Sequence, residues 1–163
     1  MNAHFINRQG YELVEISSTR KWFWPCSKTV LYHCKMDPVA PLTFVDADGG
    51  MHRTFDAEFD TDLASTTVPA LDLLGISPDC CECSAIMHDE GYHRHRELYC
   101  APGSDVWAVR EITKAQADQW LHDGALDENN YRWQADLLQW GVEKFGQGAW
   151  NNGSATGIEM CAG

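Results

Sequence analysis

The sequence predicts an α+β fold in which an N-terminal antiparallel β-sheet, or a set of hairpins, packs on three C-terminal helices. Runs of β-forming residues fill the first third of the chain, whereas helix caps and helical apolar spacing occur in its second half. A hydrophobic fraction of 44% is sufficient for a core. The length of 163 residues fits one domain, which we expect to span residues 1–150, followed by a flexible tail at 151–163 rich in Asn, Gly and Ser.

The β-rich third contains four runs from which strands are expected. Residues 11–16 and 29–35 cluster β-branched and aromatic side chains. Residues 42–45 and 51–59 flank the sequence DADGG, and this turn-forming run predicts a hairpin. A calcium loop of the EF-hand type would need a longer series of ligands and a distal Glu, so we interpret DADGG as a turn.

The three helices are expected at about 80–97, 114–127 and 129–144. Asp79 and Thr113 supply the N-caps of the first two helices, and Gly146 is placed to end the third. The third helix shows an apolar face of ordinary core type, formed by Leu137, Leu138, Trp140, Val142 and Phe145. Core positions are also expected for most of the tryptophans of this half, which are Trp107, Trp120, Trp133, Trp140 and Trp150.

The charge of the chain excludes several classes of partner. A formal net charge of -12 argues against nucleic acid, because phosphate binding needs Lys and Arg to displace counterions. It also disfavours unaided adsorption to anionic membranes, whereas a divalent cation is easily attracted. No segment approaches the ~18 apolar residues of a membrane span. The first ten residues lack a basic start followed by an apolar run, so no signal peptide is expected.

The seven cysteines are an odd number, and without an export signal we expect reduced thiols. A bridge between Cys26 and Cys34 would form only in an oxidising compartment. Cys80 and Cys83 form a C-x-x-C, which is compatible with structural zinc or with a redox role. Because this run lies in a predicted helix and no second C-x-x-C follows, buried thiols acting as small apolar side chains are the favoured interpretation.

The run IMHDEGY, followed later by QADQW, contains the residue types of a hydrolytic site. On a helix, residues four apart share a face, so His88 and Tyr92 lie together and Asp89 points to one side. A carboxylate on the next helix, Asp118, can hold one ring nitrogen of His88 while the other takes a proton from water, and Tyr92 can donate its hydroxyl to that carboxylate. Asp89 can bind a divalent cation that polarises a carbonyl group.

The spacing H-D-x-x-Y at His88, Asp89 and Tyr92, followed by A-D at Asp118, resembles the secretory phospholipases A₂ and, more closely, the phospholipase domain of parvovirus capsids. The resemblance covers about a quarter of the chain. It implies that His88 is the general base, that Asp89 is a calcium ligand, and that Asp118 orients the His. Those enzymes carry a glycine-rich calcium loop upstream, whereas Gly75 is the only glycine of the stretch that precedes this helix.

A longer set of motifs resembles a family of uncharacterised bacteriophage and prophage proteins. The set is T-D-x-A-S at 61–65, A-x-x-H-D-x-x-Y at 85–92, A-D at 117–118 and F-G-x-x-x-W ending at Trp150. The V-P-R typical of that family after T-D-x-A-S is replaced by T-T-V-P-A. Membership implies a phage origin, with a location in the host cytoplasm or the virion, and Asp62 becomes a third carboxylate and a candidate metal ligand.

Three functions remain open from the sequence. The first is a metal-assisted hydrolase of esters or amides, phospholipase-like, with His88, Asp118 and Tyr92 in the catalytic cluster and Asp89 and Asp62 on a divalent ion. The second is a non-catalytic virion or accessory protein in which the same polar cluster joins sheet to helices. The third is an inhibitor that binds a host protein through its acidic surface, with the aromatic residues 22–24 as one contact patch.

Overall fold

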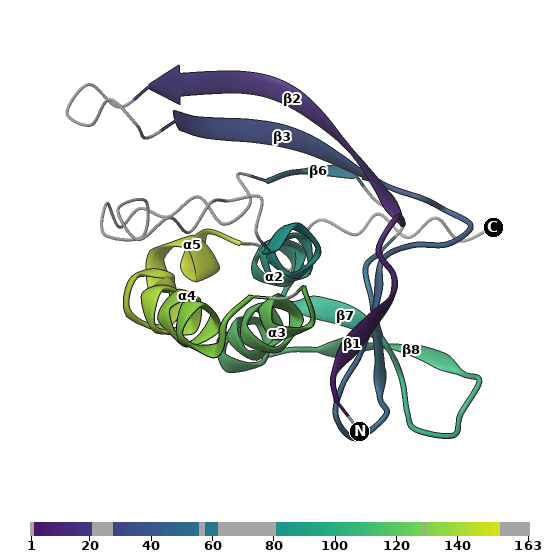
Figure 1. The fold of residues 1–163 in the computed structure, drawn as a ribbon. Coiled ribbons are helices and arrows are strands. Elements are labelled where there is room, and N and C mark those ends of the chain that lie inside the picture. The colour runs from purple at the N-terminus through teal and green to yellow at the C-terminus, as the bar shows by residue number, and fades with distance from the viewer. Residues whose placement is uncertain (1, 21–27, 56–57, 62–80, 129, 154–163) are drawn as a thin grey trace.

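The computed structural model describes residues 2–20, 28–55, 58–61, 81–128 and 130–153, and its architecture is α+β as predicted (Figure 1). The described strands are β1 (His4–Asn7), β2 (Tyr11–Arg20), β3 (Lys28–Met36), β4 (Thr43–Val45), β5 (Met51–Arg53), β6 (Glu58–Thr61), β7 (Arg96–Cys100) and β8 (Trp107–Glu111). The described helices are α2 (Glu82–Arg94), α3 (Lys114–Asp127), α4 (Arg132–Phe145) and α5 (Gln147–Asn152).

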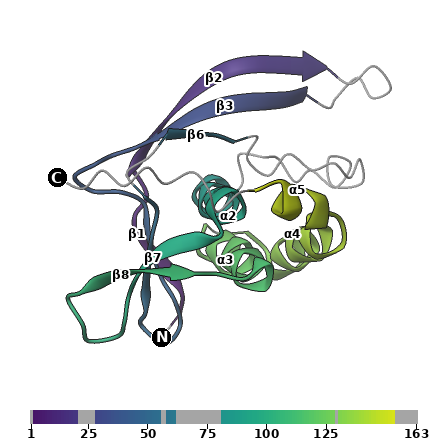
Figure 2. The ribbon, with the colours of Figure 1, turned by 180° about the vertical axis from the view of Figure 1, so that it is seen from behind.

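The strands form two antiparallel sheets whose members alternate along the chain. The larger sheet has the order β1-β4-β5-β7-β8, and the smaller has the order β2-β3-β6. The β2–β3 hairpin is therefore inserted in the chain between β1 and β4, which are neighbours in the larger sheet. Helix α2 lies between the two sheets, and α3, α4 and α5 continue the helical layer away from it (Figures 1 and 2). This position places α2 in contact with β6 on one side and β7 on the other.

The predicted hairpin around DADGG is confirmed. Strands β4 and β5 pair with Val45 opposite Met51, and Asp46 donates its N–H to the carbonyl of Gly50 at 2.9 Å. Gly49 has φ +87°, a conformation that favours glycine. The following run was expected to continue as one strand to residue 59, but it divides into β5 and β6, which belong to different sheets.

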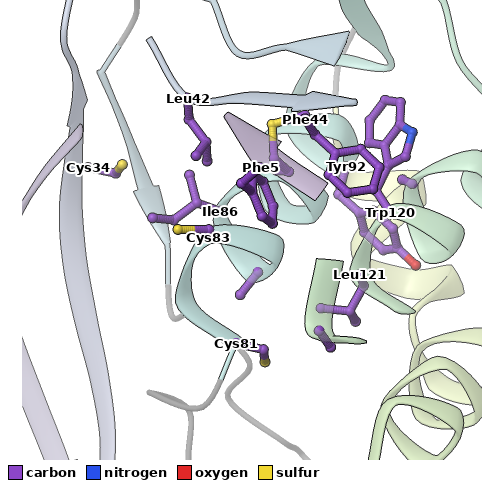
Figure 3. Close-up of a cluster of buried hydrophobic side chains, with 14 of the residues drawn as sticks. Phe5, Cys34, Leu42, Phe44, Cys81, Cys83, Ile86, Tyr92, Trp120 and Leu121 are labelled. Carbon is purple, nitrogen blue, oxygen red and sulfur yellow. The ribbon is translucent and has the colours of Figure 1, made fainter. Parts of the chain in front are cut away.

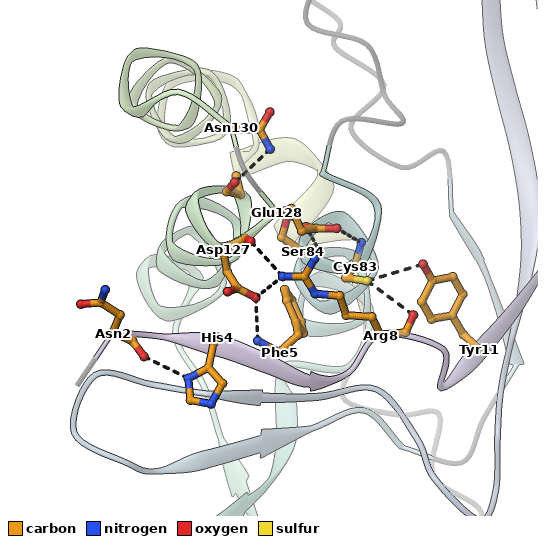
Figure 4. A network of polar contacts seen from close by, with 11 residues as sticks. Asn2, His4, Phe5, Arg8, Tyr11, Cys83, Ser84, Asp127, Glu128 and Asn130 are labelled. Carbon is orange, nitrogen blue, oxygen red and sulfur yellow. Dashed lines mark hydrogen bonds and ion pairs between the residues drawn. The ribbon is translucent and has the colours of Figure 1, made fainter.

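The first two predicted helices occur, and α3 has the expected bounds because Thr113 forms a capping box with Gln116. Helix α2 ends earlier than expected, since His95 adopts the left-handed conformation (φ 54°) and the chain enters β7. Asp79, the expected N-cap of this helix, lies outside the described residues. Glu128 caps α2 instead, because its carboxylate accepts the N–H groups of Cys83 at 2.9 Å and Ser84 at 3.0 Å (Figure 4).

The main core lies where α2 and α3 meet the larger sheet. Ile86 of α2 and Leu121 of α3 are buried there with Leu42, Phe5 and Phe44 (Figure 3). The rings of Phe5 and Phe44 lie 5.1 Å apart, so strands β1 and β4 contribute a tilted aromatic pair. Burial of this apolar surface supplies the driving force that holds the helix pair on the sheet.

The prediction of core positions on the third helix is wrong for its aromatic residues. Trp133 and Trp140 are 49% and 45% exposed, and Phe145 is 57% exposed. The buried residues of α4, which packs on α3, are Ala135, Leu138 and Gly141. The small side chains among them allow close helix packing, and the tryptophans consequently point outwards. Among the other tryptophans, Trp120 is buried as expected, whereas Trp107 and Trp150 are half-buried.

Cys34, Cys83 and Cys100 carry free, buried thiols, as the sequence predicts, and Cys81 is buried as well. Burial raises the pKa of the Cys34 and Cys83 thiols to about 12. Both groups are therefore protonated and poorly reactive at neutral pH. Cys26 and Cys80, which the bridge and zinc hypotheses require, lie outside the described residues. No helix within the described ranges is both long and apolar enough to cross a membrane.

Candidate functional site

The structure brings together His88, Tyr92 and Asp118, the three residues predicted as a catalytic cluster. His88 and Tyr92 lie one turn apart on α2, and their rings are 4.1 Å apart. Asp118 projects from α3, where its Oδ1 accepts the Tyr92 hydroxyl at 2.6 Å. The same oxygen lies 3.5 Å from His88 Nε2, an ion-pair distance without an aligned hydrogen bond. All three residues are buried, and His88 is 7% exposed.

Lys114 is a further partner of Asp118. This contact was not predicted from the sequence. The Nζ of Lys114 lies 2.7 Å from Asp118 Oδ2 and donates a second hydrogen bond, at 2.8 Å, to the carbonyl of Val142 on α4. The signal for this contact is the i,i+4 spacing of Lys114 and Asp118 on one helix. Both oxygens of Asp118 therefore face donors, and the ammonium group links α3 to α4.

Both carboxylate oxygens of Asp89 have partners within the protein. Its Oδ1 lies 3.0 Å from His88 Nδ1, and its Oδ2 accepts the hydroxyl of Thr61 on β6. Asp62, the second predicted metal ligand, lies outside the described residues. Within the described part of the chain, no group of three or more His, Cys, Asp or Glu side chains is placed to hold a metal ion. A metal site that includes Asp62 therefore stays a prediction.

The protonation of the cluster follows from burial and from the facing charges. Burial lowers the pKa of His88, but the two carboxylates of Asp118 and Asp89 outweigh it, so that the pKa is raised above 6.5. Burial raises the pKa of Asp118, but the contacts from His88, Lys114 and Tyr92 outweigh it and hold the pKa below 3.8. Burial and the neighbouring Asp118 both raise the pKa of Tyr92, so its hydroxyl remains a donor. The two facing side chains of Asp89 and Asp118 therefore favour the protonated form of the His88 ring over its neutral form.

The opposite shifts of His88 and Asp118 predict a stability optimum in mildly acidic solution. The raised pKa of His88 gives a stabilisation that is complete below 6.5 and is lost as the pH rises through the folded-state value. The lowered pKa of Asp118 gives a second stabilisation, which is complete above pH 3.8 and is lost as the pH falls through the folded-state pKa of Asp118. We therefore expect His88→Gln to destabilise the protein more at pH 5 than at pH 9, as measured by urea unfolding.

The half-buried His4, which pairs with no carboxylate among the described residues, provides the control for this experiment, since His4→Gln is expected to have the same effect at pH 5 and pH 9. Its ring contacts only the nearby carbonyl of Asn2, at 3.0 Å, among the described residues. An equal effect of His88→Gln at pH 5 and pH 9 would contradict the preference of His88 for its protonated form.

A second buried histidine, His52, has a similar arrangement in the larger sheet. Its Nδ1 lies 2.6 Å from Glu97 Oε2, and its Nε2 lies 3.0 Å from Asp46 Oδ2. Glu97 also pairs with Arg110 of β8, and Asp46 accepts the N–H of Gly50 at 2.7 Å. These contacts fasten the DADGG turn to β7 and β8. No local pattern in the sequence indicates these contacts, because they depend on the pairing of β5 with β7.

The two ring nitrogens of His88 are both occupied by facing carboxyl groups in the described geometry. A general base needs a neutral imidazole with one nitrogen open to water. Here both nitrogens face carboxylates, the ring is buried, and the facing charges favour its protonated form. The cluster also spans the molecule, because Thr61 of β6 contacts Asp89 on α2 and Lys114 of α3 contacts α4. It therefore joins the smaller sheet to three helices.

No family model matches the chain, and neither does any curated protein or solved structure.

Proposed function

We propose that this chain is a non-catalytic phage protein, a virion component or an accessory factor, which acts by binding other proteins. The observation that supports this proposal is the double engagement of His88 by Asp89 and Asp118. A ring held in this way stabilises the fold and is not available to activate water. The phage assignment draws on the motif resemblance at 61–65, 85–92 and 117–118.

The energetics of the cluster are consistent with a structural role. A buried ion pair adds little net stability relative to apolar residues, because desolvation offsets much of the attraction. Removing one partner is nevertheless strongly destabilising, and the directional contacts favour one arrangement of the elements. In this chain they fix β6, α2, α3 and the carbonyl of Val142 on α4. A rigid frame favours binding, because a preorganised surface loses less conformational entropy when a partner binds.

The overall charge favours proteins as partners and, among them, basic ones. A net charge of -12 repels phosphate backbones and accelerates encounters with positively charged surfaces. A protein of this kind would act, in one version of the proposal, by binding and inhibiting a basic host protein. The aromatic residues 22–24, predicted as a contact patch, lie outside the described residues.

Hydrolysis is the second candidate, and one contact favours it. Asp118 faces His88 Nε2 and is itself held by Tyr92, so the carboxylate is placed to orient the ring as a general base requires. This hypothesis requires Asp89 to leave His88 Nδ1 and so release that nitrogen to water. It also requires a cation or another electrophile that stabilises the developing oxyanion.

The two candidates are separated by metal titration and hydrolysis assays on matched variants. We expect calorimetry of the metal-stripped protein with Ca²⁺, Mg²⁺, Mn²⁺ and Zn²⁺ to show no binding that Asp89→Asn abolishes. We also expect the wild type to hydrolyse phospholipid and simple ester substrates no faster than His88→Gln. Asp123→Asn is the control, because Asp123 Oδ1 contacts His122 Nδ1 at 2.8 Å outside the cluster.

The contrary outcome is equally specific. Ion binding lost in Asp89→Asn but kept in Asp123→Asn, together with hydrolysis lost in His88→Gln, would overturn the non-catalytic proposal and establish the metal-assisted hydrolase. Zinc binding that is indifferent to both Asp variants would point to the cysteines and leave the proposal standing.

A further inference from the structure

Helix α4 presents Trp133 and Trp140 to solvent on its outer face, and Leu137, which also packs against the core, lies between them on the helix. The two tryptophans are about half exposed, and Leu137 is half-buried. Phe145 extends this face, because its ring stands edge-on to Trp140 at 5.8 Å. The helix lies at the outer edge of the helical layer in both views (Figures 1 and 2). Its core-facing side has already found a partner in α3, so the outer face is a separate surface.

The spacing of this outer face is that of a helix that packs on another helix. Trp133, Leu137 and Trp140 are at positions i, i+4 and i+7, which line one side of an α-helix. Because successive residues turn by about 100°, the two tryptophans lie within about 20° of one another. Single exposed apolar residues are ordinary, but two aligned tryptophans with a leucine between them indicate a contact surface.

The balanced charges of α4 favour a second copy of the chain as the partner. The helix carries two positive and two negative side chains, which cancel, whereas the whole chain has a net charge of -12. These four residues are Arg132, Asp136, Glu143 and Lys144, and all are exposed. A strongly basic partner would find no excess negative charge on this helix. A second copy of the chain carries the same balanced charges on this helix, so two such helices have no net charge to oppose their contact.

The positions of the charges also define an orientation. On the helical wheel, Arg132, Asp136 and Glu143 lie on one flank, within about 40° of one another. Asp136 lies 3.0 Å from His122 Nε2 on α3, whereas Arg132 and Glu143 make no ion pair with other described residues. Arg132 and Glu143 stand at opposite ends of the helix, about 16 Å apart along its axis. When two such helices pack antiparallel about a two-fold axis, equivalent flanks meet and opposite ends align.

We propose that α4 is a homodimer interface in which the helices of two copies pack antiparallel about a two-fold axis near residues 137–138. Arg132 then lies beside Glu143 of the partner subunit, and symmetry repeats this pair at the other end. Trp140 enters the space between Trp133 and Leu137 of the partner subunit. The assignment uses only the outer face of α4 and is independent of the role of the His88 cluster.

The apolar part of the interface is tested by sedimentation equilibrium. The wild type is expected to be a dimer, and the double variant Trp133→Glu/Trp140→Glu is expected to weaken dimerisation by about a hundredfold or more. Val109→Glu serves as the matched control, because Val109 is 55% exposed on β8, away from α4. Far-UV circular dichroism verifies that each variant is folded. A wild type that stays monomeric at about 100 μM, or a double variant that dimerises like it, would overturn the proposal.

The orientation is tested by exchanging charges. Arg132→Glu places two carboxylates together at each end and is expected to weaken the dimer about tenfold. The exchange variant Arg132→Glu/Glu143→Arg restores opposite charges and is expected to recover wild-type affinity. Recovery supports antiparallel pairing, which a non-specific apolar association would not produce. Weakening without recovery would rule out this orientation.

Discussion

Replacing Asp118 with alanine is expected to lower the free energy of unfolding by about 3 to 5 kcal/mol at pH 7. The substitution removes the carboxylate that faces the His88 ring and the Lys114 ammonium, whose side chains are 8% and 15% exposed. It also takes away the acceptor of the buried Tyr92 hydroxyl. One buried ring, one partly buried ammonium group and one buried donor would lose a partner at once. Urea unfolding followed by tryptophan fluorescence measures this loss.

Two other substitutions on α3 serve as controls for Asp118→Ala. Asp123→Ala removes a carboxylate that is 30% exposed and is expected to cost about 1 kcal/mol or less. Asp118→Asn keeps an oxygen for Tyr92 but removes the charge, and it is expected to be intermediate. A loss below about 1 kcal/mol for Asp118→Ala would show that the cluster is not a structural element. The hydrolase hypothesis would gain if that variant were stable but lost an activity of the wild type.

Gly124→Ala is expected to destabilise the protein by about 2 to 3 kcal/mol, because α2 and α3 are in very close contact at this position. A Cβ on Gly124 would lie 2.5 Å from the Cβ of Ser84 and 3.0 Å from Cε2 of Phe5. Neither neighbour can yield easily, since Ser84 belongs to α2 and Phe5 is in the core. The helices would have to separate, which would move Asp118 away from His88. Chemical denaturation gives the size of the effect.

Gly148→Ala is the matched control for this substitution. Gly148 lies in α5, where an added Cβ would meet no described atom within 4 Å. Alanine is the better helix former by about 1 kcal/mol, so this variant is expected to be neutral or slightly more stable. If Gly124→Ala behaved like Gly148→Ala, the close approach of α2 and α3 would not be a constraint on the fold.

The parts of the fold that follow from neighbouring residues could be predicted from the sequence. The β4–β5 hairpin follows from its turn, and α3 follows from Thr113 and Gln116, because each signal lies within a few residues of the element. The division of the strands into two sheets could not be predicted, since it depends on which distant strands pair. The prediction that the tryptophans of α4 occupy core positions was wrong, because an apolar residue on a helix does not by itself indicate which helix face meets the core.

The candidate site shows the same division. The approach of His88, Tyr92 and Asp118 was predicted from helical spacing and from motif resemblance. The contact of Asp89 was not, because its partner Thr61 comes from β6, a strand of the smaller sheet. The capping of α2 by Glu128 was missed for a comparable reason, as this residue follows the start of the helix by more than forty positions. Interactions across such distances leave no local pattern.

The placement of β1 has a consequence for folding during synthesis. Asp127, at the end of α3, accepts the N–H of Phe5 at 2.8 Å and pairs with Arg8 at 2.7 Å (Figure 4). β1 is an edge strand whose neighbour in the sheet is β4. A chain that leaves the ribosome N-terminus first must therefore hold Phe5 unburied until α3 has emerged. During that interval the first strand depends on chaperones or on its pairing with β4 for protection from aggregation.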